Sequence, residues 1–188
     1  ARLHGTELIP EALALARGRG VRILPTDLNE VAADHAGGFD IIAAFDVLEH
    51  LLPAQTRDLL AAVAVMLKPG GLFIARFPNG QSPFGRVFQH ADLTHVTTLS
   101  AAVLPQLIAG LPLRMLYGRD ARTVYAGGAA IRSAKRIKSL ARATIERCIK
   151  FLYDFDAPMA INVVVALERT AAPQAVSAAI APQVAIAR

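Results

Sequence analysis

The segment from Phe39 to Gly80 constrains the fold most, because it predicts one complete strand–helix–strand unit. The nearly unbroken apolar run 39–45 (FDIIAAF) is typical of a parallel strand that is buried on both faces. A helix is expected to begin at about Pro53, with apolar residues three and four positions apart along one side, and to end at the KPGG turn, 68–71. Residues 72–77 predict the next buried strand. This order of elements indicates an α/β fold.

Polar residues follow directly after the first of these strands. Asp46, Glu49 and His50 lie at its carboxyl end, which is where ligands bind in open α/β sheets. All three could instead complement the dipole of the helix that follows, an effect of about 0.3–1 kcal/mol each. For Glu49 we favour this structural role.

Two shorter strands are expected earlier in the chain, and each is followed by an acid. Residues 3–8 contain Glu7, and residues 21–24 are followed by Asp27; a helix beginning at Pro10 separates them. An acid at the end of such a strand can hold ribose hydroxyls, or it can cap the next helix.

The composition is that of a globular domain without disulfides. The chain has 188 residues, of which 54% are hydrophobic and 19% charged, enough for one domain with a substantial core. No apolar run approaches the roughly 20 residues that span a bilayer, and no signal peptide opens the sequence. The single Cys148 excludes an internal disulfide and any multi-cysteine zinc site. We therefore expect a soluble, cytoplasmic protein.

The motifs FDVLEH, at 45–50, and LKPGG, at 67–71, occur here in the order found in class I S-adenosylmethionine-dependent methyltransferases, and the chain resembles that family. The resemblance covers Leu3 to Phe77 well and extends loosely to Arg169. It implies a methyltransferase domain over 1–169 with a doubly wound, Rossmann-like, mostly parallel sheet in three α/β/α layers. It also implies S-adenosylmethionine as cofactor and no metal. The family's first strand and glycine-rich loop should precede Glu7, so we expect an N-terminally truncated fragment.

The resemblance also assigns cofactor-binding roles. It implies that Glu7 holds the ribose and that Asp27 bonds the adenine amino group. Asp46 and His50 are expected beside the methionine moiety. The complete set of expected cofactor-binding residues is Glu7, Asp27, Leu28, Phe45, Asp46 and His50.

The acceptor is expected to meet the polar segment 88–100. His95 is the candidate base, because an imidazole with a pKa near 6.5 can take the proton of a hydroxyl at neutral pH, and Asp92 could orient it. The alternative is that these are ordinary polar loop residues and that the rate comes from aligning the reactants.

The motifs SPFGR and DLTHVT, within 82–97, resemble those of bacterial methyltransferases of polysaccharide and glycan biosynthesis, which suggests a sugar hydroxyl or another small-molecule hydroxyl as acceptor. Two other functions stay open. A nicotinamide-dependent oxidoreductase would share the sheet but needs an upstream glycine pattern that the sequence lacks. A degenerate methyltransferase-like module could bind a partner through a basic helix.

That basic helix is expected at about 130–152, a segment that contains seven basic residues and one acidic residue. Its favoured role is a lid helix that packs on the sheet by its apolar face, and the second is attachment to an anionic membrane. Nucleic-acid binding ranks last, because no aromatic platform accompanies the charge. A helix over 99–111 with Ser100 as N-cap and a strand over 113–117 should precede it. The last strand, 159–167, is expected antiparallel in an edge hairpin, and 170–188 is predicted to be a disordered tail.

Overall fold

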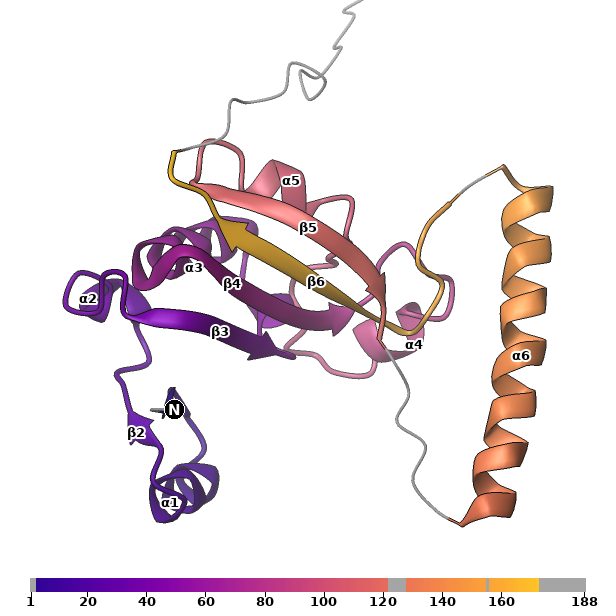
Figure 1. The fold of residues 1–188 in the computed structure, drawn as a ribbon, viewed down its shortest axis with the longest axis horizontal. Helices are drawn as coiled ribbons and strands as arrows, with labels where there is room; N and C mark the ends of the chain where they lie inside the picture. The colour runs from indigo at the N-terminus through magenta and orange to yellow at the C-terminus, as the bar shows by residue number, and fades with distance from the viewer. Residues whose placement is uncertain (1–2, 122–127, 155, 173–188) are drawn as a thin grey trace, which may run out of the picture.

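The computed structural model describes residues 3–121, 128–154 and 156–172 and contains two sheets (Figure 1). The larger sheet has the strand order β3-β4-β6-β5, and the smaller one pairs β1 with β2 in parallel. The strands are β1 His4–Gly5, β2 Arg22–Ile23, β3 Phe39–Phe45, β4 Leu67–Pro78, β5 Leu113–Asp120 and β6 Asn162–Arg169. The predicted α/β fold class is confirmed.

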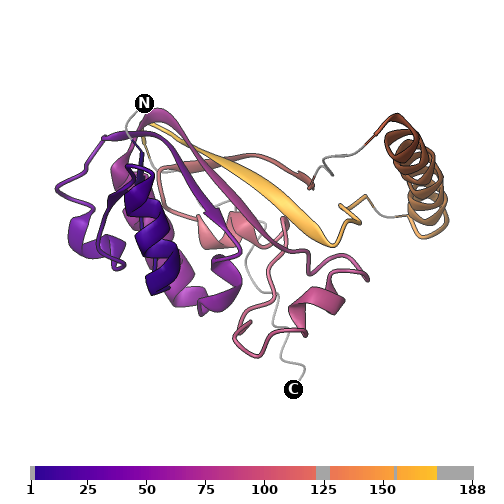
Figure 2. The ribbon, with the colours of Figure 1, turned by 90° about the horizontal axis from the view of Figure 1, so that it is seen from below.

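The helices differ widely in length. They are α1 Pro10–Gly18, α2 Leu28–Val31, the 3₁₀ helix η1 Leu48–His50, α3 Pro53–Met66, α4 Arg86–Gln89, α5 Leu104–Leu107 and α6 Ala129–Leu152. Figure 2 shows α3 and α5 on one side of the larger sheet, with α6 standing apart beyond its end. No described helix is both long and apolar enough to cross a membrane.

Strand β4 lies in the middle of the core. It runs parallel to β3, with Ala43 opposite Ile74, and antiparallel to β6, with Ala75 opposite Val165. Its side chains alternate, so that Phe73, Ala75 and Phe77 are fully buried while the residues between them are half-buried. The buried row packs against α3 and α5 in a single apolar cluster.

Strand β3 is not buried on both faces as the sequence predicts. The side chains of Ile41 and Phe45 are 58% and 55% exposed. The reason is its position: β3 pairs only with β4 among the described residues, and the helices that cover the larger sheet lie on the other face. The small sheet meets β3 through side chains rather than backbone bonds, with the rings of His4 and Phe39 edge to face at 5.3 Å.

Two predicted elements differ in more than small shifts of their ends. Strand β4 begins at Leu67 rather than at residue 72, and Gly70, with a φ of 77°, allows the KPGG segment to continue the strand irregularly. Helix α5 has four residues, is capped by Val103 and not by Ser100, and is preceded by a turn. Pro105 explains this, because proline fits only the first turn of a helix.

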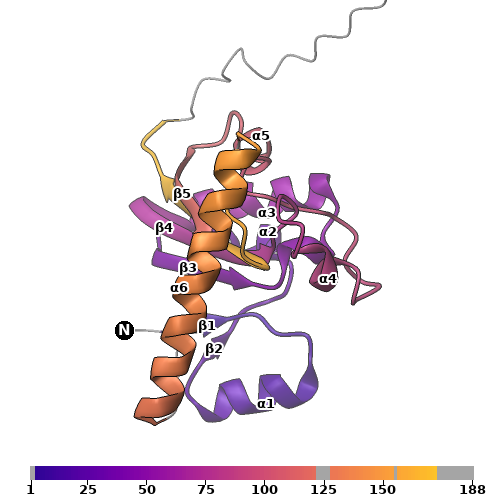
Figure 3. The same cartoon turned by 90° about the vertical axis from the view of Figure 1, so that its right-hand side faces the viewer.

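The C-terminal elements confirm one expectation and correct another. The last strand is antiparallel as predicted and pairs with the edge strand β5, while its other side pairs with β4. Helix α6 confirms the predicted basic helix, and Figure 3 shows it nearest the viewer, in front of the strands. It is not a lid packed on the sheet, because none of its residues is buried. Of the predicted disordered tail, residues 173–188 lie outside the described part of the chain.

Candidate functional site

The candidate site begins where β3 ends, at a sharp turn. Asp46 has a φ of 55°, in the left-handed region that Asp and Asn tolerate better than most side chains, and it directs the chain out of the sheet into η1. Its carboxylate forms an ion pair with Arg76 on β4, whose Nε lies 3.2 Å from Asp46 Oδ1. The guanidinium also lies over the ring of Phe45, 5.5 Å from its centre. The turn is therefore fixed to the neighbouring strand.

The polar loop 92–97 is held against η1 by its last residue. The backbone amide of Thr97 donates to the carbonyl oxygen of Glu49 at 3.1 Å, and its hydroxyl donates to that of Leu51 at 2.6 Å. These two bonds bring the loop next to His50, although the two segments are more than forty residues apart.

A short chain of hydrogen bonds sets the tautomer of the His50 ring. The hydroxyl of Thr94 donates to Asp92 Oδ1 at 2.7 Å, so its lone pairs are left for His50 Nδ1, at 2.9 Å. The same nitrogen lies 3.2 Å from the carbonyl oxygen of Thr94, which can only accept. His50 Nδ1 therefore carries the proton, and its Nε2 keeps a free lone pair.

His95 has the same tautomer for a simpler reason. Its Nδ1 lies 3.1 Å from the carbonyl oxygen of Phe88, which again can only accept, so Nε2 is the unprotonated nitrogen. Its ring meets that of His50 at 4.7 Å between centres and 64° between planes. The imidazole is therefore oriented by the backbone.

Asp92 is expected to orient the imidazole of His95, but its carboxylate bonds to Thr94 instead. Its carboxylate accepts the amide and the hydroxyl of Thr94, and both bonds lower the pKa of Asp92. It therefore positions His50 through Thr94.

Glu49, which is expected to complement the dipole of the next helix, is instead buried beside His50 and His95. Its side chain is 1% exposed, and neither carboxylate oxygen has a hydrogen-bond partner among the described residues. Burial raises the pKa of Glu49, because the charged form loses its water. Glu49, His50 and His95, here called the Glu–His–His cluster, each bring one ligand atom to within 4.8 Å of the others. The signal that could have indicated Glu49 is its place beside His50 at the end of a strand.

The other expected cofactor residues lie elsewhere. Glu7 Oε1 accepts the amides of Leu8 and Ile9 at 2.8 and 2.9 Å, just before α1. Asp27 is the N-cap of α2 and accepts the amide of Asn29 at 2.9 Å. Asp27 thus has the capping contact weighed as the alternative, whereas Glu7 holds the turn before α1, whose N-cap is Ile9. Leu28 packs against a small apolar cluster of Leu24, Ala32, Ala62 and Met66, and Phe45 stays half-exposed.

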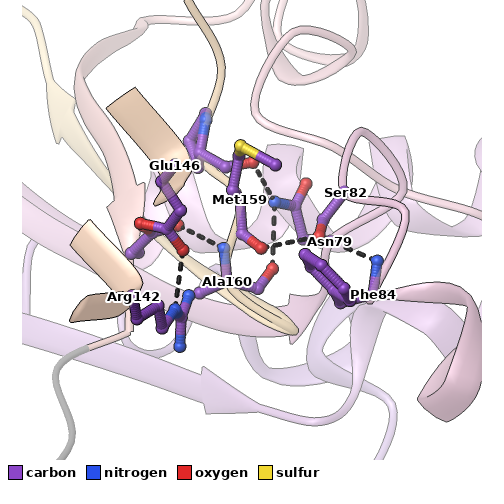
Figure 4. Close-up of polar contacts among 9 residues, drawn as sticks. Asn79, Ser82, Phe84, Arg142, Glu146, Met159 and Ala160 are labelled. Atoms are coloured by element: carbon purple, nitrogen blue, oxygen red, sulfur yellow. Dashed lines mark hydrogen bonds and ion pairs between the residues drawn. The ribbon is translucent and has the colours of Figure 1, made fainter. Parts of the chain in front are cut away.

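A second group of polar contacts ties the loop after β4 to the segment before β6 (Figure 4). The buried amide of Asn79 donates to the carbonyl oxygens of Pro158, at 2.7 Å, and Ala160, at 3.3 Å. The hydroxyl of Ser82 donates to that of Met159 at 2.7 Å. Beside this junction lies an apolar cavity of about 620 Å³, and α6 forms its other wall. Its lining residues are Phe84, Lys138, Ala141, Arg142, Ile145, Glu146, Ile149, Met159 and Ile161.

Comparison with known proteins identifies this fold. Residues 1–73 match the model of a methyltransferase domain family. A ubiquinone biosynthesis O-methyltransferase of Aromatoleum aromaticum is 38% identical over 78 residues, which cover 38% of this chain and 32% of that protein. The match thus spans about a third of the curated relatives' length.

Solved structures extend the similarity over most of the chain. A S-adenosylmethionine-dependent methyltransferase from Archaeoglobus fulgidus has a TM-score of 0.60 at 15% identity, covering 88% of this chain and 75% of that one. The N-methyltransferase NodS from Bradyrhizobium japonicum, in complex with S-adenosylhomocysteine, has a TM-score of 0.50 at 16% identity over 90% of this chain and 67% of its own. At these identities the likeness concerns the fold.

Proposed function

We propose that this chain transfers a methyl group from S-adenosylmethionine to a hydroxyl of a small molecule. Its fold is that of the class I S-adenosylmethionine-dependent methyltransferases, and its first 73 residues match a methyltransferase domain family. The observation that carries this proposal is the polar group at the carboxyl end of β3. Asp46, paired with Arg76, and His50 follow β3 there, and His95 packs against His50, at the edge where ligands bind in open α/β sheets.

The residues divide into a cofactor side and an acceptor side. We assign Glu7, Asp27, Leu28 and Phe45 to the nucleoside side and Asp46 with His50 to the methionine end. For Glu7 and Asp27 this role requires that each carboxylate offer its second oxygen, since Oε1 and Oδ1 already accept backbone amides. His95 faces the acceptor with the lone pair of Nε2, which could take the hydroxyl proton.

Two classes of acceptor suit this assignment. The O-methyltransferase relatives point to a hydroxyl in ubiquinone biosynthesis. The SPFGR and DLTHVT motifs point to a sugar hydroxyl, but their roles in the structure are local: Ser82 fixes a loop to Met159, and Thr94 positions His50. We therefore rank the hydroxyl of a ubiquinone precursor first and the glycan hydroxyl second.

Calorimetric titration of the intact protein with S-adenosylhomocysteine tests the cofactor. We expect binding that weakens at least tenfold in Glu7→Ala and in Asp27→Ala, because each removes a hydrogen-bond acceptor for the nucleoside. Glu11→Ala, an exposed acid on α1, is the matched control and should bind normally. A folded protein that does not bind would overturn the proposed function and favour the partner-binding module.

Acceptor competition separates the two hydroxyl classes. The protein is given methyl-labelled S-adenosylmethionine with a catechol, as a simple aromatic hydroxyl, or with a set of hexoses. Label in the catechol supports the first rank, and label only in a hexose reverses it. Label in neither, with cofactor bound, would remove both classes and leave the acceptor proposal without support.

We also propose that α6 places the enzyme, within the cytoplasm, on an anionic membrane surface. The helix combines a basic side with an exposed apolar stripe: Ile137, Leu140 and Phe151 lie on one side of it and are 68%, 70% and 82% exposed. Such a helix binds at the headgroup boundary, where anionic lipid attracts its basic residues. Phe151 is the single aromatic residue of α6, which is too few for a row of stacked bases, so nucleic acid is the weaker alternative.

Vesicle sedimentation tests this contact. The protein should bind phosphatidylglycerol-containing vesicles, should not bind pure phosphatidylcholine, and should detach at about 1 M salt, where the screening length is only ~3 Å. Reversing Arg136, Lys138 and Arg147 to Glu should abolish binding. Reversing Arg17, Arg19 and Arg22, which are exposed around α1, changes the net charge equally and is the control. Equal loss in both variants would mean non-specific attraction.

A further inference from the structure

We propose that the Glu–His–His cluster binds a divalent transition-metal ion, with Glu49, His50 and His95 each supplying one ligand atom. The three ligand atoms lie within 4.8 Å of one another. Ligands about 2.0–2.2 Å from a shared ion lie about 3–4 Å apart. A side-chain shift of under about an ångström therefore closes the cluster around an ion.

The carboxylate of Glu49 lacks a partner. Glu49 is almost fully buried, and neither of its carboxylate oxygens has a hydrogen-bond partner among the described residues. A carboxylate in this position is costly unless it is paired or coordinates a metal. The alternative is a carboxylic acid that stays neutral and serves only as packing, and the experiment below separates the two.

Both histidines are held in the tautomer that suits a metal ligand. Each Nδ1 is hydrogen-bonded to a backbone carbonyl oxygen, of Thr94 for His50 and of Phe88 for His95, so each Nε2 offers its lone pair. Metal-binding histidines are held in this way, with one nitrogen donating to the protein and the other free for the ion. Asp92 adds a further layer, since it fixes the hydroxyl of Thr94 that also accepts from His50.

The ligand types indicate the class of ion. Two imidazole nitrogens and one carboxylate oxygen suit Zn²⁺, Co²⁺, Fe²⁺ or Mn²⁺, whereas Mg²⁺ and Ca²⁺ prefer sites made of oxygen alone. The class I resemblance implies no metal, so this inference departs from the expectation of the sequence analysis. The proposed metal site does not require the cofactor to be bound.

The role of such an ion rests on the proposed function. Three protein ligands would leave coordination positions open, where an ion could make the proton of an acceptor hydroxyl easier to lose to water and hold the hydroxyl in a fixed orientation. Methyl transfer would then form the O–CH₃ bond as the S–CH₃ bond breaks with its electron pair on sulfur. In this arrangement His95 is a ligand and does not act as the free base.

Titration of the chelator-treated, intact protein with Co²⁺ tests the site directly, because cobalt bound to nitrogen and oxygen ligands gives visible absorption bands that the hydrated ion lacks at comparable strength. We expect one ion per chain and competition by Zn²⁺. Glu49→Gln and His95→Gln should each weaken binding at least tenfold. His90→Gln, an exposed histidine in the same region, is the matched control and should bind as the wild type does.

A fourth variant tests the positioning. Thr94→Val keeps the size of the side chain but removes the hydroxyl between Asp92 and His50, so affinity should fall about 10–100-fold with the stoichiometry unchanged. Circular dichroism establishes that each variant is folded. Absence of the absorption bands in the wild type, or equal affinity of wild type and Glu49→Gln, would overturn the inference. Because S-adenosylhomocysteine binding is measured separately, failure of the metal site and failure of the cofactor site are distinguishable.

Discussion

Asp46 combines a left-handed backbone with an ion pair, and the two effects can be measured apart. Its φ of 55° costs most residues about 1–2 kcal/mol, but less for Asp and Asn. Its pairing with Arg76 is partly exposed and contributes little stability.

We therefore predict that Asp46→Ala destabilises the fold by about 1 kcal/mol more than Asp46→Asn, although both remove the charge. Urea denaturation measures the difference. Asp40, on β3, is also paired to a cation but has no positive φ, so Asp40→Ala and Asp40→Asn should agree within about 0.5 kcal/mol. Equal costs at position 46 would contradict the backbone explanation.

Glu49 gives a prediction with a defined pH dependence. Its folded pKa is raised above the ordinary 4.5, so its contribution to stability is complete below the unfolded pKa and is lost as pH rises. Without metal, Glu49→Gln should equal the wild type near pH 4 and exceed its stability by about 1–3 kcal/mol at pH 7. Urea denaturation with EDTA at both pH values measures this.

The control for that measurement is an exposed carboxyl. Asp58→Asn on α3 should shift the free energy of unfolding by the same small amount at both pH values. Adding Zn²⁺ should stabilise the wild type alone. A Glu49→Gln variant that is less stable than wild type at pH 7 would show that the carboxylate has a stabilising partner.

At the scale of elements, local pattern predicts those parts that depend on local chemistry. β3 and the start of α3 at Pro53 follow directly from the apolar run and the proline. The exposure of β3 and the interior place of β6 do not, because they depend on which strands become neighbours. The site divides in the same way. His50 and His95 can be chosen as candidates from the polar residues next to them in the sequence. The contact between Thr94 and His50 cannot, because it joins residues 44 positions apart.

The junction between β4 and β6 depends on Asn79, and its removal should be costly. Asn79→Ala leaves the carbonyl oxygens of Pro158 and Ala160 without this donor, which should cost about 2 kcal/mol. Thermal or urea unfolding checks the value. Gln81→Ala, two residues away and exposed, should cost less than about 0.5 kcal/mol. Similar values for both would mean that water replaces the amide of Asn79.

At the scale of the whole molecule, the chain has a strongly packed part and a weakly packed one. The larger sheet with α3 and α5 forms the main core. The small sheet has two residues in each strand, α1 has no buried residue, and the attachment to the rest includes the rings of His4, His35 and Phe39. Stability should therefore differ between the two parts.

Hydrogen exchange can measure this difference. Peptides covering residues 3–24 should exchange at least ten times faster than those from β4 and β6, because few contacts bury their amides. Saturating S-adenosylhomocysteine should slow exchange in 3–24 if Glu7 and Asp27 hold the nucleoside. Peptides from α6, which has no proposed cofactor contact, serve as the control. Equal rates in all segments would show a single cooperative unit.

The place of β6 also determines when the protein can fold. Because β6 lies between β4 and β5, one edge of β4 is unpaired and β5 has no strand partner in the described sheet until residues 162–169 exist. During synthesis, the ribosome must therefore pass the end of β6 before the central sheet can close. Until then the nascent chain presents the apolar row of β4 with an unpaired edge, which is the kind of surface that chaperones bind.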